Sequence, residues 1–381
     1  MSDTAQKRKV LVTGGAGFIG LALCKQLHAH GDDVIVLDNF SGQVHGDNPA
    51  VSSELKSIAE VIVGDVRSVE DWKKALRSVD VVVHLAAETG TGQSMYAIHH
   101  YADVNINGTA ILLDLLANDD SLQVKNLVVA SSRSIYGEGR YKCNKHGYVY
   151  PSSRDSSDLN DHMFDARCPL CDDVPQLVAT TEDSLLSPAS IYASTKKTQE
   201  ELCLIAGAAL DIGVVALRFQ NVYGPGQSLQ NPYTGILSIF STRILNGNEI
   251  NIFEDGKESR DFVYIDDVVN GIVAATKSDV AMGESINIGS GKPVSVLEVV
   301  SELGRNFGVD VKYSISGSYR IGDIRHNYSD NDKAKKLMGW EPSIEFKDGI
   351  SKFVAWVLEQ EVMEDSYDKS ISELKERGLY K

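Results

Sequence analysis

The chain has 381 residues, 43% of them hydrophobic, so it can bury a large core and suits one large domain with a smaller lobe. Its formal net charge of -16 argues against nucleic acid as a partner, because binding to phosphates requires clustered Lys and Arg. The first residues lead directly into an apolar strand, and no run of about 20 apolar residues follows, so we expect a cytoplasmic protein without a membrane span. Five cysteines in such a chain argue against a disulfide framework.

Short β-branched runs alternate with helical stretches over residues 9–137, a pattern typical of an α/β fold whose parallel sheet is covered on both faces. The pattern breaks between residues 138 and 187, which we interpret as an insertion. It resumes with a helix near 190–209 and the strand GVVALRF. The strands expected before the insertion are KVLVTGG, DVIVLDN, AEVIVGD, DVVVHLAA and NLVVASS.

Residues 221–381 have shorter and more mixed elements than the preceding part of the chain. The segments EINIF, DFVYIDD and ESINIG are separated by helical stretches. We therefore expect a first domain over residues 1–220, which includes the insertion, and a smaller lobe over 221–381 that is interleaved with it.

The sequence VTGGAGFIG places Gly14, Gly17 and Gly20 directly after the first expected strand and at the start of a helix. Backbone amides and a helix N-terminus can hold a pyrophosphate there, although an ordinary tight turn can have the same pattern. Asp38 ends the second strand, where an acid can bind the ribose hydroxyls of an adenosine and repel a 2′-phosphate. The pattern therefore favours NAD over NADP, the alternative being that Asp38 only caps a turn.

Two further strand ends complete the predicted dinucleotide site. The segment GDV ends the third strand and can contact adenine, and the two small alanines that end the fourth strand leave space for the cofactor. The predicted cofactor contacts are Gly14, Gly17, Phe18, Ile19, Gly20, Asp38, Asn39, Asp65, Val66, Ala86 and Ala87, together with Tyr192 and Lys196.

The segment YASTK sets Tyr192 and Lys196 four residues apart on an expected helix, so both side chains point to one face. A phenol with a pKa near ~10 is a poor base at neutral pH, but a neighbouring ammonium favours the phenolate. Ser132, at the end of the fifth strand, can donate a hydrogen bond to the same substrate oxygen. Such a spacing also occurs by chance on ordinary amphipathic helices. Here the glycine loop, Asp38 and Ser132 come before it in the chain, and this combination favours the catalytic interpretation.

These motifs resemble the extended short-chain dehydrogenase/reductase family, the nucleotide-sugar epimerases and dehydratases, over nearly the whole chain. The segments that carry the resemblance are TGGAGFIG, LDNF, GDVRS, HLAA, SSRSIYG, YASTK, RFQNVYGPGQ, RDFVYIDD and GWEPSIEFKDGI. The resemblance implies a Rossmann-type, doubly wound parallel sheet with bound NAD, and a C-terminal lobe that holds a sugar nucleotide.

The resemblance also implies roles for individual residues. Ser132, Tyr192 and Lys196 match the catalytic residues. The residues that match substrate-binding positions, beside Ser132, are Asn221 and Arg260 for the diphosphate and ribose, and Arg320 and Asp323 near the nucleoside. Independently of the family, arginines and an asparagine amide are suitable donors for a diphosphate, the alternative being arginines in surface ion pairs.

The residues after Ser132 restrict the reaction. Family members that dehydrate the sugar resemble one another in an acidic pair directly after this serine or threonine, whereas this chain has Arg133 and Ser134. We therefore expect a 4-epimerase, which oxidises C4 and returns the hydride to the other face, so that NAD ends unchanged. The sequence assigns no positive role to Arg133.

The region SSRSIYGEGRY, the Cys/His-bearing insertion and TEDSLLSPASIYASTKKTQEE are most similar to the dTDP-L-rhamnose 4-epimerase group. This resemblance implies a dTDP-linked substrate and a role in polysaccharide biosynthesis. Two alternatives stay open. One is a UDP-hexose or UDP-hexuronate 4-epimerase, and the other is a non-catalytic dinucleotide-binding sensor.

The insertion contains two short motifs, CNKH and CPLC, separated by 21 residues. This spacing lies just outside the usual 15–20 residues of paired zinc knuckles, and four such ligands suit a closed tetrahedron. We expect a zinc lobe over residues 138–180, the alternatives being two reduced thiol pairs or a redox-active CPLC, and we expect Cys24 and Cys203 to be buried thiols. The predicted zinc ligands are Cys143, His146, Cys168 and Cys171.

The family also implies a homodimer, paired through two helices that here are expected over about 95–117 and 190–209. The segment QEELCLIAGAAL offers an apolar stripe for such a contact, but packing against the sheet explains it equally well.

Overall fold

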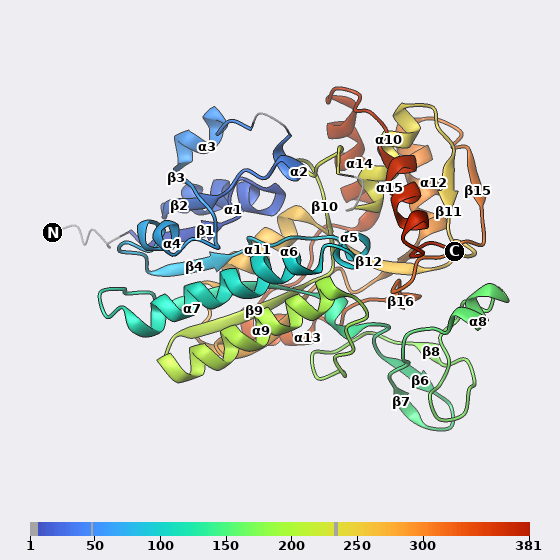
Figure 1. Ribbon diagram of the computed structural model, residues 1–381, viewed down its shortest axis with the longest axis horizontal. Helices are drawn as coiled ribbons and strands as arrows, with labels where there is room; N and C mark the ends of the chain where they lie inside the picture. Colours follow the sequence, from blue (N-terminus) through green and yellow to red (C-terminus); the bar gives the residue numbers. More distant parts are fainter. Residues whose placement is uncertain (1–6, 47–48, 232–234) are drawn as a thin grey trace.

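The computed structural model describes residues 7–46, 49–231 and 235–381 and is drawn in Figure 1. Residues 1–6, which belong to the N-terminal stretch before the first strand, lie outside the described residues. No helix in the described part of the chain is both long and apolar enough to cross a bilayer.

A seven-stranded parallel sheet forms the centre of the molecule, with the strand order β13-β9-β5-β4-β1-β2-β3. Counted along the chain, this order is 7-6-5-4-1-2-3, so the sheet is doubly wound, with its switch point between β1 and β4. The strands are β1 (Lys9–Thr13), β2 (Asp33–Asp38), β3 (Ala59–Val63), β4 (Val81–His84), β5 (Asn126–Ser132), β9 (Gly213–Phe219) and β13 (Glu284–Ile288). The expected Rossmann-type sheet is confirmed.

Helices cover both faces of this sheet because both faces of its strands are apolar. In β1, Val10 and Val12 join one core cluster and Leu11 joins another, as the alternation of side chains along a strand requires. The first cluster is closed by α1 (Phe18–Ala29), α3 (Ser53–Ile58) and α11 (Ile265–Ala275). The second is closed by α4 (Val69–Ala75), α7 (Gly108–Asn118) and α9 (Ile191–Leu210).

The helix expected over about 190–209 is confirmed as α9, whereas the one expected over about 95–117 is interrupted. A π-helical turn, Asp103–Asn107, separates α6 (Ile98–Ala102) from α7. Figure 1 shows α7 and α9 side by side in front of the large sheet, in direct contact. Two short helices near the strand ends are α2 (Gly42–His45) and α5 (Thr91–Ser94).

The insertion forms a small body of its own, drawn in green at the lower right of Figure 1. Its antiparallel sheet has the order β7-β6-β8. Its elements are β6 (Tyr141–Cys143), β7 (Gly147–Val149), α8 (Ser156–Asn160) and β8 (Gln176–Leu177), and a 3₁₀ turn, Arg133–Tyr136, precedes it. Strands this short leave most of the lobe to loops.

The C-terminal part of the chain contributes β13 to the large sheet and builds two smaller sheets. In the first, β12 pairs with β10, β14 and β16, and in the second β11 pairs with β15. The strands are β10 (Asn221–Tyr223), β11 (Ile250–Ile252), β12 (Ser259–Tyr264), β14 (Pro293–Ser295), β15 (Tyr313–Ile315) and β16 (His326–Asn327). The helices are α10 (Ile236–Leu245), α12 (Val296–Phe307), α13 (Asp332–Met338), α14 (Phe346–Leu358) and α15 (Tyr367–Glu376), with a 3₁₀ turn, Asp279–Ala281.

Candidate active site

A cavity of about 510 Å³ lies at the carboxyl ends of β1, β2, β4, β5 and β9. In doubly wound sheets, ligands bind at this edge, beside the switch point. The cavity is lined by every cofactor contact predicted from the sequence except Asp65, and also by Ser132 and Asn221. Residues that are far apart in sequence therefore meet in one place because parallel strands end at the same edge.

The glycine loop requires glycine for steric reasons. Gly14 has φ +67, and a Cβ there would lie 3.0 Å from the backbone nitrogen of Ala86. A Cβ on Gly20 would lie 2.1 Å from the carbonyl oxygen of Gly14, so a side chain at either position would force the loop away from its neighbours. The loop keeps its backbone against β4 and the start of α1, where amides can face a pyrophosphate.

Asp38 ends β2 as a nearly buried carboxylate on the cavity wall. The amide of Ala16 donates to Asp38 Oδ2 at 3.0 Å, and the amide of Phe40 donates to Oδ1 at 2.8 Å. Each carboxylate oxygen can accept a further bond, so Asp38 caps its own turn and remains able to accept from a ribose hydroxyl. The two readings of Asp38 from the sequence are compatible.

Asp65 does not line the cavity, although its neighbours Gly64 and Val66 do. Arg67 donates to both oxygens of Asp65, at 2.9 and 2.8 Å, and Asn39 Nδ2 donates to Oδ2 at 3.2 Å. Hydrogen bonding to Arg67 lowers the pKa of Asp65 to about 2. The carboxylate is therefore an anchor for Asn39 and for the turn after β3.

The three predicted catalytic residues meet on the cavity wall. Ser134 donates to Ser132 Oγ through its amide at 3.2 Å and its hydroxyl at 2.9 Å, which leaves the Ser132 proton free to be donated elsewhere. Burial raises the pKa of Tyr192, while a hydrogen bond with Ser132 and the charge of Arg133 lower it. Arg133 is thus a cation that favours the phenolate, a role that the sequence did not assign.

Lys196 is buried and its ammonium is held by a hydrogen-bond chain. Its Nζ donates to Gln199 Oε1 at 2.6 Å, and Gln199 Nε2 donates to Thr109 Oγ1 at 2.8 Å. Burial lowers the pKa of Lys196 from 10.5 to about 8. Gln199 is three residues beyond Lys196 on α9, a spacing from which this contact can be inferred in hindsight.

The hydrogen-bond chain continues to the end of β1 through a neutral histidine. Thr109 Oγ1 donates to the carbonyl of Asn105 at 2.7 Å, so His84 Nε2, at 3.0 Å from that hydroxyl, must be the donor to it. His84 Nδ1 then accepts from Thr13 Oγ1 at 2.8 Å. Burial lowers the pKa of His84 to about 3, in agreement with an uncharged ring.

Two cavity residues adjoin Asn221. Arg133 Nε donates to Asn221 Oδ1 at 3.0 Å, which orients the amide that the family resemblance assigns to the diphosphate. Gln220 is buried, and neither end of its amide has a hydrogen-bond partner among the described residues. A primary amide with both ends free is suited to a ligand amide or hydroxyl, and its place at the carboxyl end of β9 is a signal that sequence reasoning could have used.

Glu88 and Thr89 also line the cavity and were not predicted. Glu88 Oε1 lies 3.1 Å from His100 Nε2, and the amide of Glu88 donates to Asn105 Oδ1 at 2.8 Å. Both residues directly follow the predicted pair Ala86 and Ala87, so extending the strand-end argument by two positions would have found them.

Three predicted substrate contacts do not line the cavity. Arg260 donates to the carbonyls of Ser259, Arg325 and Ile324 at 2.9, 3.0 and 2.7 Å. Arg320 places its guanidinium over the ring of Phe253, and Asp323 lies 3.9 Å from Arg260. In this structure these side chains contact other residues of the C-terminal part, although Arg320 Nε has no hydrogen-bond partner among the described residues.

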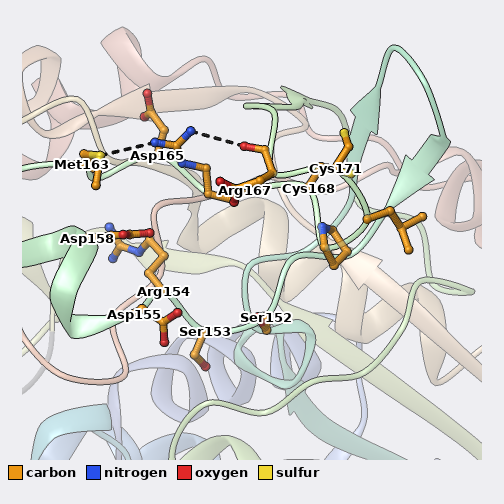
Figure 2. A pocket seen from close by; sticks show the side chains of 13 residues that line it. Ser152, Ser153, Arg154, Asp155, Asp158, Met163, Asp165, Arg167, Cys168 and Cys171 are labelled. Atoms are coloured by element: carbon orange, nitrogen blue, oxygen red, sulfur yellow. Dashed lines mark hydrogen bonds between the residues drawn. The ribbon is translucent and has the colours of Figure 1, made fainter.

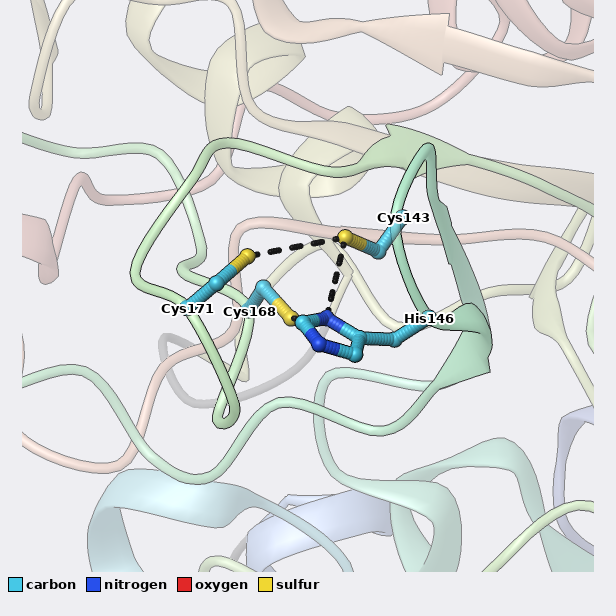
Figure 3. A group of neighbouring side chains, drawn as sticks. All are labelled: Cys143, His146, Cys168 and Cys171. Atoms are coloured by element: carbon cyan, nitrogen blue, oxygen red, sulfur yellow. Dashed lines mark hydrogen bonds between the residues drawn. The ribbon is translucent and has the colours of Figure 1, made fainter.

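The four predicted zinc ligands are brought together, in the insertion and not in the cavity. One ligand atom from each lies within 4.8 Å of the others, as Figure 3 shows. Cys24 and Cys203 are fully buried in the cores on the two faces of the large sheet, as expected.

The chain belongs to the NAD-dependent epimerase/dehydratase family, whose model matches residues 10–155 and 163–289. The stretch that the match skips, residues 156–162, lies inside the insertion. The resemblance seen in the sequence and the predicted enzyme class are both confirmed.

Individual relatives are similar over nearly the whole chain. A dTDP-L-rhamnose 4-epimerase of Burkholderia thailandensis is 36% identical over 355 residues, 93% of this chain and 96% of that protein. UDP-glucuronate 4-epimerase 4 of Arabidopsis thaliana is 30% identical over 92% of this chain and 75% of its own. The UDP-glucuronic acid 4-epimerase of Bacillus cereus, solved with UDP-glucuronic acid and NAD, has a TM-score of 0.74 at 28% identity over 92% of this chain and 99% of that one.

Proposed function

We propose that this protein is a nucleotide-sugar 4-epimerase that uses NAD, oxidises C4 of the sugar transiently and restores it with inverted configuration. The observation that carries the proposal is the meeting of Ser132, Tyr192 and Lys196 with the glycine loop in one cavity. The relatives of known activity named above are 4-epimerases of dTDP- or UDP-linked sugars, which supports the same reaction here.

The side chains of this chain perform the proton transfers and hold the substrate oxygen. NAD, when bound, accepts the hydride from C4 and returns it. Tyr192 takes the proton of the C4 hydroxyl, and the hydroxyl of Ser132 donates a hydrogen bond to the same oxygen as the carbonyl forms. The charge of Arg133 favours the phenolate of Tyr192, and the ammonium of Lys196, one turn further along α9, is proposed to act in the same direction. Reversal of these steps, after the keto-sugar turns, gives the epimer.

Dehydration of the sugar is a poorer fit. Elimination requires a general acid next to the serine, and the next two residues are Arg133 and Ser134, one a cation and the other bonded to Ser132. Neither can act as a carboxylic acid. The cation beside Tyr192 instead serves the oxidation step, which an epimerase performs in both directions.

For the substrate we propose dTDP-L-rhamnose first, with a UDP-hexose or UDP-hexuronate as second candidate. The 36% identity to a dTDP-L-rhamnose 4-epimerase supports the first, and the 30% identity to a UDP-glucuronate 4-epimerase supports the second. Asn221 is proposed to bind the diphosphate, and Arg260, Arg320 and Asp323 the nucleotide. The three carbonyl bonds of Arg260 use three of its five N–H donors, so the guanidinium keeps donors for the substrate.

We also propose a cytoplasmic homodimer that pairs through the neighbouring helices α7 and α9. Ile205 on α9 is 70% exposed, which leaves an apolar side chain for such a contact. Sedimentation at micromolar concentration tests this, and a monomer there would refute the pairing.

The decisive experiment is proton NMR of candidate sugar nucleotides with purified protein and no added cofactor. Inversion at C4 of dTDP-L-rhamnose, with NAD(H) released only when the protein is denatured, is the expected result, because an epimerase recovers the hydride that it removes. Bound dinucleotide without turnover of any dTDP- or UDP-sugar would favour a sensor. Turnover that consumes added cofactor would contradict epimerisation.

A further inference from the structure

We propose that Cys143, His146, Cys168 and Cys171 hold one structural zinc ion, and that this ion keeps the insertion in place against the C-terminal segment 319–325. Nothing in the 4-epimerase reaction needs the metal, so the site stands without the proposed function. Only its expected effect on substrate binding rests on that function.

Three of the six distances between the four ligand atoms match a zinc tetrahedron, and all six lie within 4.8 Å. With Zn–S near 2.3 Å and Zn–N near 2.0–2.1 Å, tetrahedral geometry places two sulfurs about 3.8 Å apart and a sulfur about 3.6 Å from a nitrogen. Cys143 Sγ lies 3.7 Å from Cys171 Sγ, and His146 Nδ1 lies 3.6 Å from the sulfurs of both Cys143 and Cys168. Figure 3 shows the four side chains pointing to a common centre.

The alternatives to a metal explain this arrangement less well. A disulfide brings its sulfurs to about 2.05 Å, far closer than the 3.7 Å between Cys143 and Cys171. Hydrogen bonds between reduced thiols and imidazole do not explain the arrangement either, because one ring nitrogen can make only one such bond, as donor or acceptor. His146 Nδ1 faces two sulfurs at the same distance. A cation at the centre satisfies all four ligands.

Two backbone turns present the ligands. Cys143 ends β6 and His146 lies in the turn that leads to β7, and the amide of Lys145 donates to Cys143 Sγ at 3.4 Å. In the second turn, the amide of Asp172 donates to the carbonyl of Cys168 at 2.9 Å. The amide of Cys168 donates to the carbonyl of Asp173 at 2.9 Å, which closes the loop. Each turn thus holds one ligand pair on one side of the ion.

The lobe has little else with which to order itself. Its core cluster consists of five buried residues, of which Cys143 and Cys168 are themselves ligands. The apolar side chains of Tyr148, Leu170 and Val174 are more than half exposed. A bound metal supplies folding free energy where apolar burial is insufficient, and four protein ligands leave no open position for catalysis.

The lobe is in turn joined to the C-terminal segment by a buried arginine. Arg154 Nη1 donates to Glu254 Oε2 at 2.9 Å, and Nη2 donates to the carbonyl of Asp323 at 3.0 Å and forms an ion pair with Glu254 Oε1 at 2.8 Å. Its Nε lies 3.1 Å from Glu138 Oε1, an ion pair too bent to count as a hydrogen bond. Figure 2 shows one cavity lined by both Arg154 and the loop that carries Cys168 and Cys171.

A second contact joins the same two parts. Leu159 and Phe164 of the insertion pack against Tyr319, whose hydroxyl donates to Asn160 Oδ1 at 2.8 Å. Arg325 donates to Asp165 at 3.1 Å. The segment that is held in this way includes two of the proposed nucleotide contacts, Arg320 and Asp323, so loss of the metal is expected to raise KM for the sugar nucleotide and to leave bound NAD in place.

Metal analysis of the full-length protein, purified without chelator, tests the site independently of activity. We expect about one zinc per chain, most of it lost in Cys168→Ser and retained in Cys203→Ala, a matched change at a buried cysteine outside the site. Zinc retained by Cys168→Ser would overturn the ligand set, and a different metal in stoichiometric amount would overturn the choice of ion.

If Cys168→Ser does not fold, titration of the unaltered protein with a mercurial reagent decides the question. The reagent should release zinc in step with the modification of three thiols and should make residues 138–187 sensitive to protease. Protein that carries no zinc and yet has a protease-resistant insertion would refute the proposal. A 4-epimerase that is active without zinc would refute only the link to the substrate, whereas a zinc protein without turnover would refute only the proposed function.

Discussion

The cofactor cavity and the insertion differ in how their functional side chains are brought together. In the cavity, the predicted residues follow the ends of parallel strands, and seven strands with two apolar cores hold them. In the insertion, four ligands come from two short segments, and the core cluster has five buried residues, two of which are ligands themselves. The first region is positioned by its backbone, and the second depends on its ligands and on buried ion pairs.

This difference determines what single substitutions should do. A side chain on a rigid sheet edge can be removed with little effect on the fold, so its loss appears mainly in catalysis. A side chain that joins two poorly packed parts is itself a support, so its loss appears mainly in stability. Pairs of substitutions, one at the site and one at a control position, separate these outcomes.

The largest effect is expected for Tyr192→Phe, which removes the proton carrier and almost no volume. The turnover number should fall by roughly 10²- to 10⁴-fold, because that is the usual contribution of a general base. Bound NAD and the urea midpoint should stay close to those of the unaltered protein, and Tyr313→Phe, at a tyrosine 48% exposed on β15, is the matched control. Turnover within twofold of the unaltered protein would remove Tyr192 from the mechanism.

Arg154→Met should give the opposite pattern, with a large effect on stability. Its side chain is 4% exposed, and the change leaves the buried carboxylates of Glu138 and Glu254 without this partner. Breaking such a pair costs about 3–5 kcal/mol of the free energy of unfolding, which urea titration measures. Arg77→Met, at an exposed arginine, is the control. Equal stability of the two variants would show that the ion pairs do not support the insertion.

Much of the large sheet could be predicted from the sequence, because β-branched runs bounded by glycines and acidic residues are compatible with few other structures. Details that depend on distant partners could not. The segment DFVYIDD was expected as one strand-like element, but β12 ends at Tyr264 and α11 begins at Ile265. Asp267 then accepts from the amides of Ser343 and Ile344, residues about 75 positions away that no local pattern could supply.

The candidate site was predictable to a similar degree and for the same reason. Strand ends and the YASTK spacing indicated cofactor contacts that, except for Asp65, do line the cavity, but they missed others such as Glu88, Thr89 and Gln220. Ligand chemistry indicated the four insertion residues. The role of Arg133 required the structure, because its charge acts on Tyr192 across the cavity. The positions of Arg260 and Arg320 depend on carbonyl and ring partners in the C-terminal part, which the sequence motifs do not specify.

The burial of the Lys196 ammonium beside the cavity can be tested through the pH dependence of the free energy of unfolding. Burial lowers its pKa in the folded protein to about 8, whereas the unfolded chain keeps the ordinary value of 10.5. Between these values the unfolded state holds more protons, so stability should rise with pH. At 1.36 kcal/mol per pKa unit, the free energy of unfolding should gain roughly 3 kcal/mol relative to Lys196→Met.

Urea titrations of both proteins from pH 7.5 to 10.5 measure this gain, and the difference between them removes the other titrating groups. Lys197→Met, whose ammonium pairs with Glu201 on the outer side of α9, is the control and should show a much smaller change with pH. A difference that is constant with pH, or that falls as pH rises, would contradict a buried ammonium at this position.

The smallest effect is expected at Asp38, where the backbone of the cavity should tolerate a change of charge. Asp38→Asn keeps an oxygen for one of the two amides, of Ala16 and Phe40, and removes the negative charge that repels a 2′-phosphate. We expect roughly tenfold tighter binding of NADP, about 1.4 kcal/mol, with NAD weakened slightly, as measured by calorimetry on protein stripped of its dinucleotide. Asp33→Asn, at the opposite end of β2, is a control with the same change of charge and should leave both affinities unchanged. If NADP binding is the same in Asp38→Asn as in the unaltered protein, Asp38 only caps its turn, and the preference for NAD must come from another residue of the cavity.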